Sequence, residues 1–274
     1  MISAQILFKT AAVFYGLSLV SALVFRKKPI TVLIFMLAAL AANAASLTLR
    51  YLAAWPMLPM YLGPVALPFC LGILSIFNKK NYENNTVFRL ILFLILFLSL
   101  TAVFFPKDFY MPFIKSKTVL SHLFLLFGVT GKSCFLTGSA WAIAGFIGSK
   151  RKQGKNETRK SIIGILTYRI IPVLQSRYFL QCSMRWIVWG FSLLTLSMFS
   201  GELWSYIGWG TPVVWDDAAI TTTMAIWFFY ICLLHLHHTG TWTPQARGCY
   251  AASGVFLILG LNSIPDLGPF RWPF

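Results

Sequence analysis

Long apolar runs divided by short polar segments make up most of this chain. The runs contain about 20 apolar residues each, enough for a helix to cross roughly 30 Å of hydrocarbon. Lys, Arg, Asn and Pro are common in the segments between them. The pattern predicts eight transmembrane helices. They cover approximately residues 4–25, 30–54, 57–77, 86–105, 119–148, 184–204, 218–238 and 247–263.

The segment from Ser161 to Cys182 departs from this pattern. Arg169, Pro172 and Arg177 interrupt its apolar runs and make it too polar to span. We expect an amphipathic helix that lies on the cytoplasmic leaflet of the membrane. No polar stretch is long enough to fold as a separate soluble domain. The expected fold is an all-α, polytopic transmembrane bundle of about eight spans with one cytoplasmic interfacial helix.

The basic residues predict the orientation of this bundle. With the N-terminus outside, fifteen of the 23 Lys and Arg residues fall in or beside the inside loops, against four outside. This asymmetry follows the positive-inside rule for membrane proteins. The N-terminus and the C-terminus are then both extracytoplasmic, together with five of the seven acidic residues. We expect the bilayer to be the bacterial cytoplasmic (inner) membrane.

The composition supports a membrane protein and argues against other classes. Apolar residues make up 58% and charged residues 11%, whereas a soluble domain carries about a quarter charged residues. The net charge of +16 reflects the inside loops, and no basic stripe interleaved with exposed aromatic residues indicates nucleic-acid binding. The five cysteines fall singly, without a Cys-x-x-Cys pair, so they indicate neither a redox centre nor a zinc site.

The four histidines are the first candidates for chemistry. His122 lies at the outer end of the span over 119–148, whereas His235, His237 and His238 close the span over 218–238. His235 follows Asp217 by about 18 residues along one helix, which is roughly 27 Å and reaches the far side of the bilayer. Imidazole is a common axial ligand of haem iron, and ionisable groups inside membranes are costly to bury. The alternative for each is a hydrogen-bonded interfacial residue. With Cys232, the inner group also suggests a copper or zinc site, which lacks a fourth ligand.

Two basic residues lie inside predicted spans. Lys132 is in the middle of the span over 119–148, and Arg50 is near the outer end of the span over 30–54. The ammonium group of Lys132 and the guanidinium group of Arg50 can each pair with a carboxylate, including a haem propionate. The alternatives are a Lys132 side chain that snorkels outward and an Arg50 that anchors its helix at the interface.

Aromatic residues concentrate between Gly201 and Asp217, which we expect to form an extracytoplasmic loop. Seven of the ten tryptophans lie between residues 186 and 242. An interfacial aromatic belt accounts for most of them, but not for the order Trp-Gly-x-x-x-x-Trp-Asp. Aromatic faces can stack on a porphyrin. The loop therefore suggests a haem-binding surface, the predicted ledge, which is formed by Trp204, Trp209, Trp215 and Asp216. The alternative for Asp216 is a cap on the next helix.

At these residues the sequence resembles the CcsA/ResC/CcmC family of haem-handling proteins, which mature c-type cytochromes. The tryptophan-rich signature of that family, approximately W-G-x-x-W-x-W-D, appears here as WGTPVVWD at residues 209–216. His122, at the head of SHLFLLFGVTGKSC, matches the first extracytoplasmic histidine of the family. His235 matches its transmembrane histidine. The resemblance covers roughly residues 118–263.

The resemblance divides the chain into two parts. Residues 1–117 are N-terminal transmembrane helices of unassigned role. Residues 118–274 are a CcsA-like haem-handling domain that carries the tryptophan-rich loop at 201–217 on the extracytoplasmic side.

The resemblance implies a haem-delivery protein for c-type cytochrome maturation. A b-type haem, bound transiently or stably, would lie against the aromatic loop with its iron on His122 and be presented to an apocytochrome c. His235 would be an axial ligand of a transmembrane haem, and a ResB/CcsB-like membrane partner would complete both sites. If catalysis is retained, the chain is part of a holocytochrome c synthase, with lyase-type haem attachment and no assigned catalytic residue.

Three departures from the family pattern support an alternative. The central Trp of the signature is Val213, and Asp217-Ala218-Ala219 replaces the acid–base residues that commonly follow the Trp-Asp pair. No histidine follows the last span. The second outer ligand is therefore missing, and Met111 is a weak substitute. These features favour a CcsA-derived, non-synthase membrane anchor subunit of a larger respiratory or electron-transfer complex. A transporter for another solute is a third hypothesis, with little support from midplane polar groups.

Overall fold

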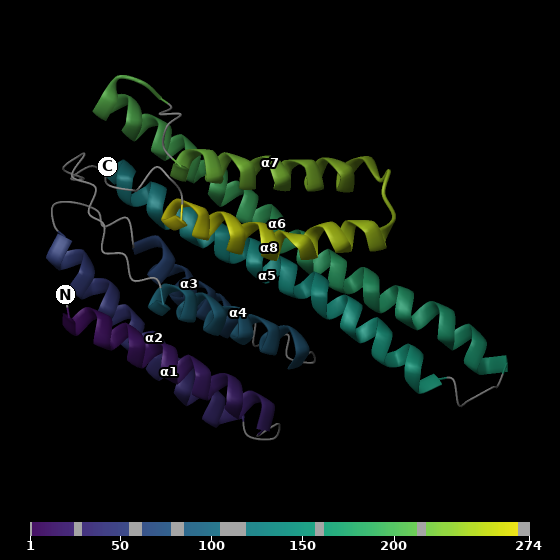
Figure 1. Ribbon diagram of the computed structural model, residues 1–274. Helices are drawn as coiled ribbons and strands as arrows, with labels where there is room; N and C mark the ends of the chain where they lie inside the picture. Colours follow the sequence, from purple (N-terminus) through teal and green to yellow (C-terminus); the bar gives the residue numbers. More distant parts are fainter. Residues whose placement is uncertain are drawn as a thin grey trace.

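The helices of this protein follow the apolar runs of its sequence. The computed structural model describes residues 2–24, 29–54, 62–77, 85–104, 119–156, 162–212 and 218–267. Within these ranges all regular structure is helical (Figure 1). The helices are α1 (Ile2–Val24), α2 (Pro29–Ala54), α3 (Leu62–Phe77), α4 (Asn85–Phe104), α5 (Val119–Asn156), α6 (Ile162–Trp209), α7 (Ala218–Thr239) and α8 (Pro244–Leu267).

Five of the described helices are long and apolar enough to cross a membrane. These are the stretches Ser3–Val24, Ile30–Ala53, Thr86–Phe104, Val119–Gly148 and Arg177–Gly208. A shorter apolar helix covers Val65–Phe77. The all-helical, polytopic architecture is confirmed, and the sides on which the termini lie stay a prediction.

The segment expected to form a separate interfacial helix is instead the first part of α6. This helix continues without a break over 48 residues, and Pro172 does not end it. The polar residues of this segment do not oppose helix formation, and its place outside the membrane stays a prediction. The helix therefore extends alongside the end of α5, and this pair projects beyond the other helices (Figure 1). The separate interfacial helix was a wrong prediction.

The expected loop over 201–217 is also shorter than predicted, because α6 extends to Trp209. The helix ends at Gly210, whose φ of 74° lies in the left-handed region that favours glycine. The Gly210 amide donates to the carbonyl oxygen of Tyr206 at 2.9 Å, and the Ser205 hydroxyl donates to the carbonyl oxygen of Thr211 at 2.8 Å. These bonds satisfy polar groups at the helix end.

Glycines allow α5 and α6 to pack closely as an antiparallel pair. A Cβ atom at Gly131 would lie 3.0 Å from the carbonyl oxygen of Gly190, and one at Gly138 would lie 3.0 Å from that of Ser183. Small residues at helix interfaces let backbones approach in this way. Near the end of α5 that the sequence predicts to be extracytoplasmic, the outer end, the Ser197 hydroxyl donates to the carbonyl oxygen of Phe124 at 2.7 Å. The start of α5 therefore lies beside the end of α6.

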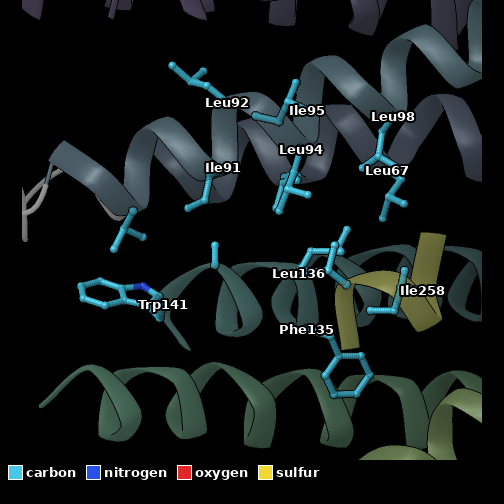
Figure 2. Packing of buried hydrophobic residues seen from close by; sticks show 14 of the residues in the cluster. Leu67, Ile91, Leu92, Leu94, Ile95, Leu98, Phe135, Leu136, Trp141 and Ile258 are labelled. Atoms are coloured by element: carbon cyan, nitrogen blue, oxygen red, sulfur yellow. The ribbon is translucent and has the colours of Figure 1, made fainter. Parts of the chain in front are cut away.

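One continuous apolar core joins the N-terminal helices to the C-terminal ones. It includes residues from α1 through α8. In Figure 2, Ile91 and Leu94 of α4 are directed at α5, from which Leu136 faces back, while Phe135 points to the other side, toward α6. α5 therefore lies between α1–α4 and the other C-terminal helices (Figure 1). The division of the chain after residue 117 stays a prediction.

A buried amide connects three of the N-terminal helices. Asn43 of α2 is fully buried, and its Nδ2 atom lies 3.3 Å from the Tyr15 hydroxyl on α1 and 3.4 Å from the carbonyl oxygen of Val65 on α3. Hydrogen bonds between helices in an apolar environment stabilise a bundle by about 0.6 kcal/mol each.

We expect Asn43→Ala to lower the free energy of unfolding by about 1–2 kcal/mol, because it removes both bonds and leaves a small void. The midpoint of unfolding of the detergent-solubilised protein measures this loss. Thr48→Ala is the matched control, since Thr48 is an exposed residue of α2 whose hydroxyl bonds only to its own helix at Ala44. Equal midpoints for the two variants would show that the amide contributes nothing to the bundle.

Candidate functional site

The imidazole of His122 lies at the outer end of α5 and is half-buried. Its Nε2 atom is 2.8 Å from the hydroxyl oxygen of Tyr51, on the last turn of α2. The two rings meet edge to face, with centroids 5.8 Å apart. On its other side, Nδ1 lies 3.5 Å from the hydroxyl of Ser121, at the limit of a hydrogen bond. The imidazole is thus held in position by the end of α2.

Tyr51 is a site residue that sequence reasoning missed. It is separated from His122 by 71 positions, and no motif or spacing links them. Its neighbour Arg50, which the sequence proposes as a partner for a propionate, is half-buried on the same turn of α2. The fold therefore brings Arg50 and the imidazole to the same end of the bundle.

Trp204 packs at the same end, on the opposite side of α5. Its indole stacks on the ring of Phe124, with centroids 6.5 Å apart and planes inclined by 30°. Gly201 makes room for that ring, because a Cβ atom there would lie 2.8 Å from Cδ2 of Phe124. Phe124 and His122 are two residues apart on a helix and so project in nearly opposite directions. The indole of Trp204 and the imidazole of His122 flank α5 from two sides.

The remaining members of the predicted ledge are beyond what the structure describes. Trp209 is the last residue of α6, and only its backbone is described. Trp215 and Asp216 lie outside the described residues, as does Met111. Their assignment to the site stays a prediction.

Of the three histidines at the end of α7, predicted to be the inner end, one is hydrogen-bonded and two are exposed. His237 accepts a hydrogen bond at Nδ1 from Nη1 of Arg247 at 3.0 Å, which ties α7 to α8. His235 and His238 are exposed. Cys232, one turn before His235, is exposed as well. No group of three or more His, Cys, Asp or Glu side chains in the described part of the chain is arranged to hold a metal ion.

The outer and inner imidazoles belong to different regions of the bundle. The ring of Tyr230 on α7 stacks face to face on that of Phe135 on α5, with centroids 3.6 Å apart. Counted along the helices from this contact, His122 and His235 are separated by about 27 Å. No single iron atom can bind both. Their places near opposite faces of the membrane stay a prediction.

Lys132 lies between these two regions, half-buried on α5. Within the described residues it forms no ion pair that would identify a partner. Its pairing with a propionate stays a prediction, as does snorkelling.

The donor set at the outer end suits haem by its chemistry. It offers an imidazole nitrogen, a stacked aromatic pair and the guanidinium of Arg50. Haem iron takes an axial imidazole, its ring stacks on aromatic faces, and its propionates pair with guanidinium groups. His122 and Arg50 therefore fit this group, whereas Trp204 and Phe124 lie on the other side of α5 from the imidazole.

The fold and these two regions define a polytopic helical membrane protein with imidazole groups towards both ends of the bundle. Comparison with known proteins is specific at this point. The chain belongs to the cytochrome C assembly protein family, whose model matches residues 5–261. The match includes α1–α4, so the kinship extends well beyond the region 118–263 in which motifs are recognisable.

Individual relatives match over shorter stretches. The chain is 34% identical over 97 residues to the cytochrome c biogenesis protein CcsA of Prochlorococcus marinus strain MIT 9515, covering 34% of this chain and 31% of that protein. It is 26% identical over 172 residues to CcsA of Guillardia theta, covering 59% of this chain and 56% of that protein. The matched part thus spans from a third to just over half of these relatives. No solved structure matches.

Proposed function

We propose that this protein binds haem and delivers it to apocytochrome c during the maturation of c-type cytochromes. The observation that carries the proposal is the half-buried imidazole of His122 at the outer end of α5. It occurs in a chain whose family match extends over residues 5–261. The relatives in that family are described as cytochrome c biogenesis proteins.

At the outer end, each residue has a separate task. His122 is the axial ligand for the iron. Trp204, with Phe124 behind it, and the loop residues Trp209 and Trp215 provide aromatic surface, and Asp216 orients the ligand or caps α7. Arg50 pairs with a propionate carboxylate. Residues 118–274 form the haem-handling part of the chain. The helices α1–α4 contribute to the outer site through the last turn of α2, which carries Arg50.

His235 supports a second haem position near the inner face. It is exposed on α7, beside Cys232. A polar side chain that faces outward from a membrane helix is stabilised when a partner subunit covers it. A ResB/CcsB-like membrane protein is such a partner, and it also supplies the second outer histidine that this chain lacks.

The covalent chemistry needs little from the chain itself. When bound, haem supplies the vinyl groups to which the cysteine thiols of an apocytochrome add, as in a lyase-type synthase. The residues named here bind, orient and shield, and none of them acts as a nucleophile. The substrate surface is the extracytoplasmic aromatic loop, in a protein of the bacterial inner membrane.

Two features of the sequence favour a second function. Val213 interrupts the signature, and the sequence has no histidine after α8. A CcsA-derived subunit that anchors a larger respiratory or electron-transfer complex needs neither the complete signature nor the second outer histidine.

Complementation separates the two functions. In a bacterial strain without its CcsA-type synthase subunit, we expect this chain, expressed with the partner, to restore covalent haem in c-type cytochromes. Haem staining of a denaturing gel measures the restoration. His122→Ala is expected to abolish it, whereas His238→Ala, at an exposed residue of the opposite end, leaves it intact. Failure of the unaltered chain, despite membrane insertion, would favour the anchor subunit.

A further inference from the structure

The contact between Tyr51 and His122 occupies the nitrogen that an iron ligand needs. Nε2 is the less hindered of the two imidazole nitrogens, because it is remote from Cβ and the main chain. In the structure it lies 2.8 Å from the phenol oxygen of Tyr51. If the phenol donates, the lone pair of Nε2 is engaged; if Nε2 donates, it carries a proton. In either tautomer Nε2 has no lone pair available for a metal.

We propose that Tyr51 competes with haem for Nε2 of His122, and that this competition sets the affinity of the outer site. The inference rests on the proposed function, which it deepens by naming a positioning residue outside the recognisable motifs. Coordination through Nε2 requires the phenol to withdraw. Apparent affinity is then reduced by the fraction of molecules in which Tyr51 still holds the imidazole. When haem leaves, the phenol recaptures the nitrogen.

The position of Tyr51 in the fold allows this exchange. α2 packs chiefly against α1 and α3, and the hydrogen bond joins it to α5 at its last turn. Tyr51 is half-buried, and the next two residues, Leu52 and Ala53, are exposed. The phenol can therefore rotate away without disturbing the buried core. The hydrogen bonds of Asn43, by contrast, lie in the buried core, where the side chain has no room to rotate away.

A delivery protein benefits from such a competitor. A carrier whose ligand nitrogen is permanently open would hold haem tightly and release it slowly. A neutral hydrogen bond stabilises the empty site by about the equivalent of a fivefold change in an equilibrium constant. That is enough to tune release without preventing binding. The N-terminal helices thereby acquire a role in the outer site.

The test uses Tyr51→Phe in the full-length, detergent-solubilised protein, with Tyr178→Phe as the matched control. Tyr178 is an exposed tyrosine of α6 that lies next to Trp141 of α5, well away from His122 along that helix. The first measurement needs no haem: diethyl pyrocarbonate modifies free imidazole nitrogens, and peptide mass spectrometry follows the rate at His122. We expect Tyr51→Phe to raise this rate severalfold, with His238 unchanged as the internal reference.

The second measurement is a titration with haem followed by visible absorbance. We expect Tyr51→Phe to lower the dissociation constant about fivefold, and Tyr178→Phe to leave it unchanged. An unchanged modification rate at His122 overturns the inference. Weaker haem binding also overturns it, since Tyr51 would then support the ligand. If neither protein binds haem while the modification rate rises, the proposed function fails and the competition fails with it, although the phenol is confirmed as a cover for Nε2.

Discussion

His122→Ala is expected to abolish the Soret absorbance of the purified chain, whereas His235→Ala leaves it nearly unchanged. The reason is geometric. The two imidazoles are separated by about 27 Å along the helices, so they serve separate positions. His122 is half-buried beside Tyr51, whereas His235 is exposed. Loss of an outer-shell partner already lowers metal affinity about 10–100-fold, and loss of the axial ligand itself costs more.

The same measurement after co-expression with the partner tests the second position. The absorbance of the complex is then expected to fall partly in each variant, since both positions are filled. His238→Ala is the control for both experiments, because this exposed residue lies three positions after His235 and is given no ligand role. A Soret band that persists in His122→Ala and disappears in His235→Ala would place the iron of the isolated chain at the inner end instead.

Gly131→Leu is expected to have the largest effect on the fold. Any Cβ atom at residue 131 would lie 3.0 Å from both the carbonyl oxygen of Gly190 and the amide nitrogen of Leu194. Both neighbours are backbone atoms and cannot rotate away, so α5 and α6 must separate. Overpacking of this kind costs about 1–3 kcal/mol, and the displaced helices carry Phe124 and Trp204 with them.

Gly260→Leu provides a matched control for this substitution. Gly260 lies on α8, and a Cβ atom there would have no neighbour within 4 Å. We expect the thermal midpoint of Gly131→Leu in detergent to fall by several degrees relative to Gly260→Leu. Similar midpoints in the two variants would mean that α5 and α6 tolerate a wider spacing than this packing allows.

Much of the architecture follows from the linear order of apolar residues. Each apolar run long enough to cross a bilayer forms a helix, because a backbone in hydrocarbon must satisfy its hydrogen bonds within the segment. That constraint is local, so the helices can be read from the chain. The motif around residues 209–216 likewise identifies the family without a structure, since a signature is a property of adjacent residues.

Two expectations about where helices end were wrong, the separate interfacial helix over 161–182 and the loop beginning at residue 201. Arg169 and Arg177 are charged, but arginine is compatible with an α-helix, and α6 continues through both. In the same way, the aromatic residues before Gly210 are helical rather than part of a loop. Solvent preference and backbone conformation are separate properties, and the residues from 162 to 182 carry information chiefly about the first.

The neighbours of the candidate ligand could not be read from the chain. Histidine at position 122 is a candidate from its type and from the motif that it heads, but its hydroxyl partner lies 71 residues away on α2. Likewise, nothing in the spacing of the Trp204 region shows that its indole packs on Phe124, across α5 from the imidazole. Such contacts depend on how helices that are distant in sequence rotate and cross. Apolar order and motif therefore predict the helices and the family, while helix packing decides which side chains meet at the site.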